Sequence, residues 1–132
     1  MKKVVLDTIV IVSAFLNPAG KPAFILQAIL RHDLDIYLNT AILAEYEEVL
    51  SRSKFTGKIY KPSIQRFFDI LMDLGINVLC SPSSIELPDE NDRKFYDVAK
   101  ASEAVLITGN KKHYPNDRLV CDPAEYLYKY TL

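Results

Sequence analysis

Acidic side chains stand in this sequence at points where an apolar segment ends or a helical pattern begins. Asp7 follows the apolar segment VVL, and the stretch LPDEND brings Asp89 and Asp92 to the start of a helical pattern. Glu45 lies on or beside the apolar stripe of another helical pattern, with no basic residue four positions later. Converging carboxylates repel one another unless a cation neutralises them, and Mg²⁺ and Mn²⁺ prefer such oxygen ligands. These acids therefore indicate a divalent-metal site.

Each acid also has an ordinary structural interpretation. Asp7 fits a turn or cap at the end of a strand. Asp89 fits a helix N-cap with Asp92 in the first turn, an arrangement that favours the helix dipole. Capping needs only one such acid, so it explains Asp89 better than Asp92. Glu45 is the acid that local structure explains least.

The elements that would position these residues alternate along the chain. Short apolar, β-branched segments predict strands at 2–7, 35–39, 76–79, 104–108 and 118–121. Apolar residues at helical spacing predict helices at 21–32, 41–52 with Thr40 as the cap, 61–75, 89–102 and 122–130. This alternation implies right-handed βαβ units and a mostly parallel sheet covered on both faces. Ligands bind beyond the carboxyl ends of the strands in such sheets, where Asp7 and Asn110 would lie.

Length and composition narrow the class of protein. A chain of 132 residues with 49% hydrophobic residues predicts one domain, 1–132, with a substantial core. The net charge of −1 excludes a broadly basic surface, so a nucleic acid would need a local basic patch. No apolar run reaches the roughly 18 residues of a membrane span. The first 17 residues resemble a signal peptide, but Asp7 interrupts them and no cleavage site follows, so we interpret them as a first strand and expect a cytoplasmic protein.

Cysteine and histidine do not indicate a soft-metal site. Cys80 and Cys121 show neither a metal-binding spacing nor a nucleophile motif, and both adjoin apolar segments as small core residues do. His32 and His113 are too few and too isolated to indicate zinc.

Four segments together resemble the PIN-domain nucleases, in particular the branch assigned as toxins of toxin–antitoxin pairs. They are VVLDTIVIVSAFLNPAGKPAFIL, TAILAEYEEVLSRSKF, LPDENDRKFYDVAKAS and VLITGNKKHYP, in the family's order and across nearly the whole chain. The resemblance implies a three-layer α/β/α sandwich with a five-stranded parallel sheet in the order 3-2-1-4-5. It also implies a ribonuclease that depends on Mg²⁺ or Mn²⁺, with RNA as substrate and an antitoxin protein as partner.

Matched position by position, the resemblance assigns the catalytic and metal-binding acids to Asp7, Glu45 and Asp92. Asn110 stands where many members carry a fourth aspartate and would be a weak ligand, and Asp89 resembles an auxiliary acid. The metal-bound water, deprotonated, would attack the phosphorus of single-stranded or looped RNA. Residues near these positions that could contact the substrate are Thr8, Thr108, Arg52, Lys54, Lys111, Lys112 and His113. For each cation, solvated surface charge is an equal alternative, and Arg52 also has Glu48 four positions earlier as an ordinary ion-pair partner.

One position departs from the family pattern. Members usually read LDTNV near the start, and this chain reads LDTIV, so Ile9 replaces a polar residue that resembles a group orienting the metal site. Loss of such an outer group can lower activity about 10–100-fold. The implied strand order also places Cys80 and Cys121 at opposite edges of the sheet, so we expect no disulfide.

Three other functions were weighed. A haloacid-dehalogenase-type phosphatase needs a second acid at Ile9, and a receiver domain needs an aspartate after the third strand, which INVLCSPS lacks. The serious alternative is a weakly active or inactive PIN domain that binds RNA or protein.

The aromatic segment EYLYKY could be the surface through which the chain forms a homodimer or higher oligomer, or it could pack inward as a core-facing helix.

Overall fold

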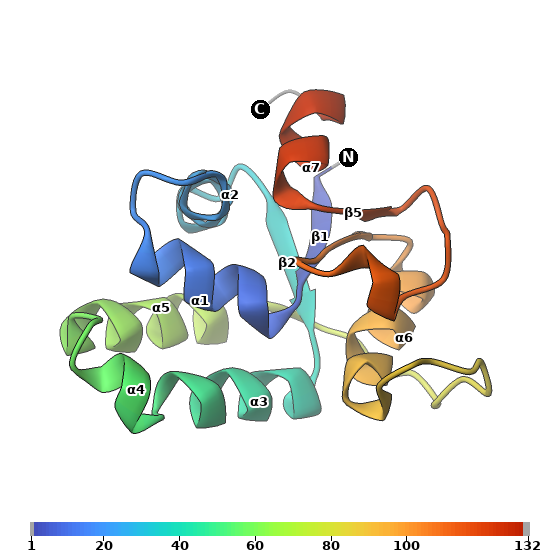
Figure 1. Cartoon of the computed structure of the whole chain (residues 1–132), viewed down its shortest axis with the longest axis horizontal. Coiled ribbons are helices and arrows are strands. Elements are labelled where there is room, and N and C mark those ends of the chain that lie inside the picture. The colour runs from blue at the N-terminus through green and yellow to red at the C-terminus, as the bar shows by residue number, and fades with distance from the viewer. Residues whose placement is uncertain (1, 131–132) are drawn as a thin grey trace.

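The computed structural model describes residues 2–130, and its centre is a five-stranded parallel sheet in the order β3-β2-β1-β4-β5 (Figure 1). The strands are β1 (Lys3–Leu6), β2 (Asp35–Leu38), β3 (Ile76–Asn77), β4 (Val105–Ile107) and β5 (Val120–Cys121). The helices are α1 (Thr8–Leu16), α2 (Lys21–Leu30), α3 (Thr40–Leu50), α4 (Ser53–Thr56), α5 (Lys61–Leu74), α6 (Arg93–Ser102) and α7 (Pro123–Lys129). Two short 3-10 helices span Glu90–Asp92 and Lys111–His113. The α/β class and the strand order confirm the prediction.

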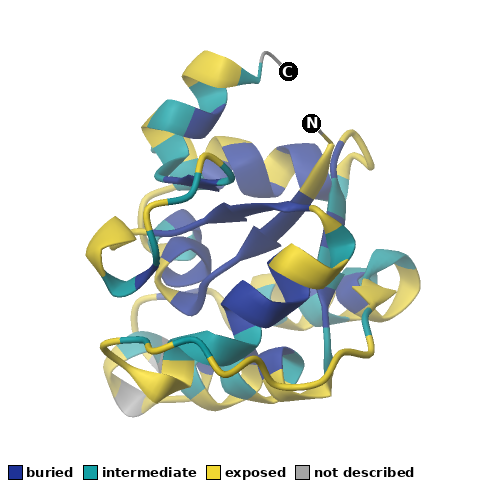
Figure 2. Ribbon diagram, turned by 90° about the vertical axis from the view of Figure 1, so that its right-hand side faces the viewer, coloured by how far each residue is buried: buried dark blue, intermediate teal, exposed yellow. Residues whose placement is uncertain are grey.

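Helices cover both faces of this sheet. Helix α6 packs against β1, β2 and β4, whereas α1, α2, α3 and α5 lie on the other side (Figure 1). Helix α7 follows the edge strand β5 and packs against α2. The strands are therefore enclosed, and Figure 2 shows the buried sheet within a shell of partly exposed helices.

The central strand positions the first acid. Val4, Val5 and Leu6 of β1 are completely buried, because strands on both sides and helices on both faces enclose them. Leu6 pairs with Ile107 of β4, and the next backbone amide, that of Asp7, donates to the Ile107 carbonyl at 3.1 Å. Asp7 and Thr108 are thus neighbours at the carboxyl ends of adjacent strands.

The N-terminal segment differs from the prediction. Within the first 17 residues a strand was predicted at 2–7, and β1 ends at Leu6 as expected, but Thr8–Leu16, for which no element was predicted, form helix α1. The segment TIVIVSAFL is apolar around the whole helix, so it lacks the one-sided periodicity by which helices are recognised. Asp7 starts the helix by accepting a hydrogen bond from the Val10 amide.

Several smaller expectations also changed. Helix α3 is capped by Asn39, whose side chain accepts from the Ile42 amide, and Thr40 is its first residue. Both cysteines are free, as expected, but Cys80 is exposed and so is no core residue.

The C-terminal aromatic segment divides between the core and solvent. Tyr126 is fully buried and Tyr128 is 90% exposed. Each of the two predicted alternatives, a core-facing helix and an exposed aromatic surface, therefore describes only part of the segment.

Within residues 2–130, no single helix is long and apolar enough to cross a membrane, and α1 and α2 reach that length only as a pair bent by 100°.

Candidate active site

Asp7 is a buried carboxylate at the carboxyl end of the central strand. One of its oxygens accepts from the Val10 amide at 3.2 Å, and the other accepts from the Thr108 hydroxyl. Burial raises the pKa of Asp7 from 3.8 to about 6, against the lowering effect of these hydrogen bonds. The charge of Asp92 raises it further. Asp7 is therefore an acid whose ionised form the metal-free protein stabilises poorly.

Glu45 is placed by helix α3, which is anchored to the same strand end. The neighbouring residue Tyr46 is fully buried, and its hydroxyl donates to the Leu6 carbonyl at 2.5 Å. The Glu45 carboxylate accepts from the Thr8 hydroxyl at one oxygen and lies 2.7 Å from the Lys94 ammonium at the other. The absence of a nearby basic residue in the sequence was therefore misleading, because α6 brings one from a distant part of the chain.

Asp92 ends the 3-10 helix that leads into α6. Its neighbour Asp89 caps that helix by accepting from the Asn91 amide at 3.0 Å, which agrees with the capping interpretation. Burial raises the pKa of Asp92, and so does the charge of Asp89, while His113 lowers it. The His113 Nδ1 lies 3.0 Å from Asp92 Oδ2, an ion-pair distance without the alignment of a hydrogen bond.

Asn110 belongs to the same edge of the sheet. Its backbone amide donates to the Thr108 hydroxyl oxygen at 3.0 Å, and its side-chain nitrogen lies 2.9 Å from His113 Nε2. Thr108 thereby links Asn110 to Asp7, and His113 links Asn110 to Asp92. Thr8 and Thr108, considered above as substrate contacts, are buried and hold Glu45 and Asp7 instead.

Tyr114 is a site residue that the sequence reasoning did not identify. Its ring is buried, and its pKa is raised first by burial and then by the charges of Asp7, Asp92 and Glu45. The charges of all three predicted acids thus act on this one hydroxyl. The only signal in the sequence was an aromatic residue in the polar segment TGNKKHYP, which is weak because such residues usually pack in the core.

The donors of this site fit a hard divalent cation, although their present arrangement does not enclose one. Among residues 2–130, no three Asp, Glu, His or Cys side chains are grouped closely enough to hold an ion. Asp92 Oδ2 and the Tyr114 hydroxyl are nevertheless buried, and neither has an aligned hydrogen-bond partner within the described part of the chain. Buried oxygens without an aligned hydrogen bond, of which Asp92 Oδ2 has the charge contact with His113, are what an oxygen-seeking cation would satisfy.

The predicted substrate cations do not join this group. Arg52 pairs with Glu48 at 2.8 Å, and Lys111 pairs with Glu125 at 2.9 Å. The Lys54 ammonium lies 5.0 Å from the centre of the Phe55 ring, and Lys112 is exposed. Across residues 2–130, none of these four side chains forms an ion pair with Asp7, Glu45 or Asp92.

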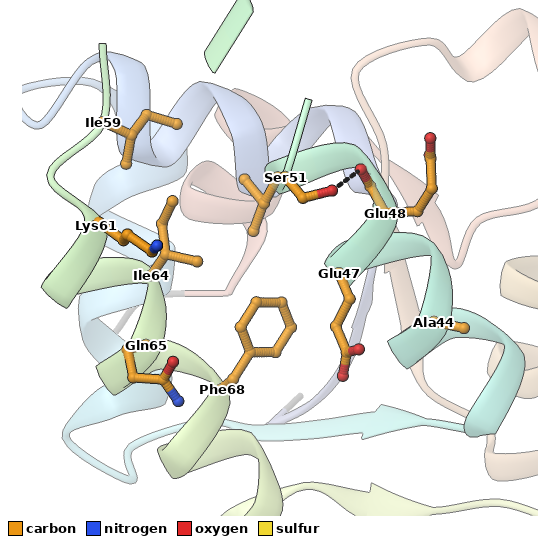
Figure 3. Close-up of a pocket in the computed structure, with 10 residues that line it drawn as sticks. Ala44, Glu47, Glu48, Ser51, Ile59, Lys61, Ile64, Gln65 and Phe68 are labelled. Atoms are coloured by element: carbon orange, nitrogen blue, oxygen red, sulfur yellow. Dashed lines mark hydrogen bonds between the residues drawn. The ribbon is translucent and has the colours of Figure 1, made fainter. Parts of the chain in front are cut away.

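A cleft of about 890 Å³ lies elsewhere, between α3 and α5 (Figure 3). Ile64 and Phe68 of α5 face Glu47 of α3 across it, and Ser51 donates to the Glu48 carbonyl at 2.8 Å along its rim. None of the predicted acids lines this cleft, and its walls are mainly apolar. The predicted acids therefore lie at the sheet edge and not in this hollow.

Comparison with known proteins identifies the architecture. The family model described as "PIN domain" matches residues 3–112. An uncharacterized protein of Methanocaldococcus jannaschii, MJ1680, is 35% identical over 112 residues, which cover 83% of this chain and 71% of that protein. No solved structure matches the chain significantly.

Proposed function

The chain belongs to the PIN-domain family, and from that membership we propose that it is a divalent-metal-dependent ribonuclease that hydrolyses RNA phosphodiester bonds. PIN domains are generally nucleases and typically use divalent metal ions. The observation that carries the proposal is a chain of contacts beyond the carboxyl end of the central strand, in which Thr108 links Asp7 to Asn110 and His113 links Asn110 to Asp92. This is where ligands bind in parallel α/β sheets.

The proposed ligands are Asp7, Glu45 and Asp92, with Asn110 contributing weakly and Asp89 as an auxiliary acid. When bound, Mg²⁺ or Mn²⁺ supplies an activated water and neutralises the charge that develops on the phosphate. Thr108 orients Asp7 by donating to its outer oxygen, and Thr8 does the same for Glu45. His113 holds Asp92 and Asn110 in place from the following loop.

Burial raises the pKa of two of the proposed ligands, Asp7 and Asp92. The high pKa of Asp7 and Asp92 reflects carboxylates that water solvates poorly, so a cation at the site gains more from them than from exposed acids. Lys111 and Lys112 follow Asn110 and are exposed, so they would supply positive charge to an RNA backbone, for which Lys111 would have to leave Glu125. Most nucleic-acid affinity comes from such phosphate contacts.

The resemblance to toxins extends the proposal to a biological role. In that role the chain would arrest growth by cleaving cellular RNA until a cognate antitoxin binds it. Expression in a bacterial host should then stop growth for the wild type and not for Asp92→Asn. The competing function is a PIN domain that binds RNA or protein without cleaving it, which Ile9 and the paired state of Glu45 favour.

The decisive assay is cleavage of labelled single-stranded RNA with Mg²⁺, with Mn²⁺ and with chelator. Asp92→Asn should abolish metal-dependent cleavage, because it removes a proposed ligand while keeping the size of the side chain. Asp69→Asn is the matched control, since Asp69 is exposed on α5 and bonds only Gln65 in the described structure. Absence of cleavage by folded wild type with either metal would favour the binding module.

A further inference from the structure

Lys94 is directed at the glutamate of the candidate site. It is the second residue of α6, and its ammonium lies 2.7 Å from Glu45 Oε1 on α3. The same nitrogen donates to the Asn91 carbonyl at 2.6 Å and lies 5.2 Å from the centre of the Phe95 ring. Two further groups, the Asn91 carbonyl and the Phe95 ring, therefore hold this ammonium beside the carboxylate.

The Lys94 side chain is more enclosed than the lysines of the other ion pairs among the described residues. The Lys94 side chain is 20% exposed, whereas those of Lys100 and Lys111 are 50% and 46% exposed in their own pairs. The second oxygen of Glu45 is taken by the Thr8 hydroxyl. Both oxygens of this carboxylate are thus engaged by the chain itself, which leaves Glu45 less available to an ion.

The surrounding charges explain why a lysine belongs there. Asp7, Glu45 and Asp92 all act on the Tyr114 hydroxyl, and the cations facing this group are Lys94 and, when protonated, His113. Without a positive charge, partly desolvated carboxylates repel one another. Lys94 supplies that charge permanently because it is covalently part of the site.

We propose that Lys94 is a tethered counter-ion that competes with the divalent cation for Glu45. This inference rests on the proposed metal site. In the metal-free protein the ammonium neutralises Glu45, and coordination by Glu45 requires the ammonium to leave Oε1. Lys94 also lines a hollow of about 310 Å³ with Asn91 and Asp97, which gives the displaced side chain room. Lys94 thereby sets the concentration of metal at which the site fills.

The test is the affinity of the full chain for Mn²⁺, measured by isothermal titration calorimetry. Lys94→Met keeps the aliphatic packing and removes the charge, so it should bind Mn²⁺ about tenfold more tightly or better, within the range found for groups around metal ligands. Lys94→Arg keeps the charge and should remain closer to wild type. Should Lys94→Met fail to fold, Lys94→Gln removes the same charge with a polar side chain.

Lys100→Met is the matched control. Lys100 lies on the same helix, 2.7 Å from Asp117 and 6.0 Å from the centre of the Tyr96 ring, so it repeats the local chemistry of Lys94 away from Glu45. Its substitution should leave Mn²⁺ affinity unchanged. A second measurement is the melting temperature in the presence of chelator. Adding Glu45→Gln to Lys94→Met should restore the stability that Lys94→Met loses alone.

The outcomes separate this inference from the proposed function. Mn²⁺ binding that is equal or weaker in Lys94→Met than in wild type overturns the counter-ion role and leaves the metal site standing. Absence of Mn²⁺ binding in wild type and in every Lys94 variant overturns the metal site and this inference with it. Binding that appears only once the charge is removed supports both.

Discussion

Replacing Asp7 by asparagine should stabilise the metal-free protein, although it alters the centre of the candidate site. A pKa raised from 3.8 to about 6 means that ionised Asp7 is less stable in the folded chain than in the unfolded chain. At pH 7 this difference amounts to about 3 kcal/mol of folding free energy. Asparagine has no charge to desolvate, so the variant avoids that loss.

The expected gain is smaller than the full electrostatic figure. Asparagine caps helices about as well as aspartate, so the bond from the Val10 amide is retained. The bond from the Thr108 hydroxyl becomes a neutral one and loses about 1 kcal/mol. The net gain is then about 1–2 kcal/mol, or roughly 3–8 °C in melting temperature for a chain of this size.

The pH dependence identifies the cause. Between pH 3.8 and about 6 the folded wild type binds more protons at Asp7 than the unfolded chain does, so its stability falls as pH rises through this window. The electrostatic loss is about 0.6 kcal/mol at pH 4, about 1.6 at pH 5 and about 3 at pH 7. The variant has no such titration, so its advantage should grow with pH and then level off.

Thermal or urea unfolding with chelator at pH 4, 5, 6 and 7.5 measures this difference. Asp122→Asn is the control, because Asp122 caps α7 by accepting from the Glu125 amide at 2.8 Å and lies outside the acid group. It should lose up to about 1 kcal/mol from the helix dipole, which is the opposite sign. An Asp7→Asn protein that is no more stable than wild type at pH 7.5, or whose advantage is independent of pH, would refute the reasoning.

Three further predictions test neighbouring parts of the site. In the presence of chelator, Asp92→Asn should be more stable than wild type by about 0.5–2 kcal/mol, because repulsion between Asp92 and the other acids is relieved. In thermal melts, millimolar Mn²⁺ should reverse or erase this difference. Lower stability of the variant with chelator would instead support a capping role for Asp92. Tyr114→Phe should change the free energy of unfolding by less than about 0.5 kcal/mol, since its hydroxyl interacts with Asp92 without an aligned hydrogen bond. Tyr46→Phe should lose about 1–2 kcal/mol with its bond to the Leu6 carbonyl. Equal losses in urea unfolding would contradict this. Ile9→Asn should change the free energy of unfolding by no more than about 0.5 kcal/mol, because Ile9 is 60% exposed. The same variant should raise the rate of RNA cleavage about tenfold or more. An unchanged rate would show that a polar residue is not needed at this position.

The sequence identified Asp7 for a reason that the fold confirms. A carboxylate directly after a buried, β-branched segment must lie at the carboxyl end of a strand, and Leu6 does end the central strand. Strand order followed from the family resemblance, which carries long-range information that local periodicity lacks. The helix after Asp7 was missed because its residues are apolar on every side, a pattern shared by buried helices and buried strands.

The partners of the acids could not be predicted in the same way. Glu45 was singled out because no basic residue lies one helical turn later, yet Lys94 reaches it from α6, and Thr8 reaches it from α1. These contacts depend on how α1, α3 and α6 converge at the strand ends, which is a property of tertiary packing. The role of Tyr114 depends on the same convergence.

The pairing of Glu45 also affects how metal binding should be interpreted. A site whose carboxylate is already neutralised gains less from Mn²⁺ than an open group of acids, because the measured affinity is the difference between two cations at one ligand. Weak Mn²⁺ binding by the wild type would therefore be consistent with an active nuclease whose Lys94 competes for Glu45. It would be equally consistent with a binding module that has lost its metal. Only the comparison of wild type with Lys94→Met separates these cases, since removing the ammonium strengthens binding at a masked site and changes nothing where no site exists.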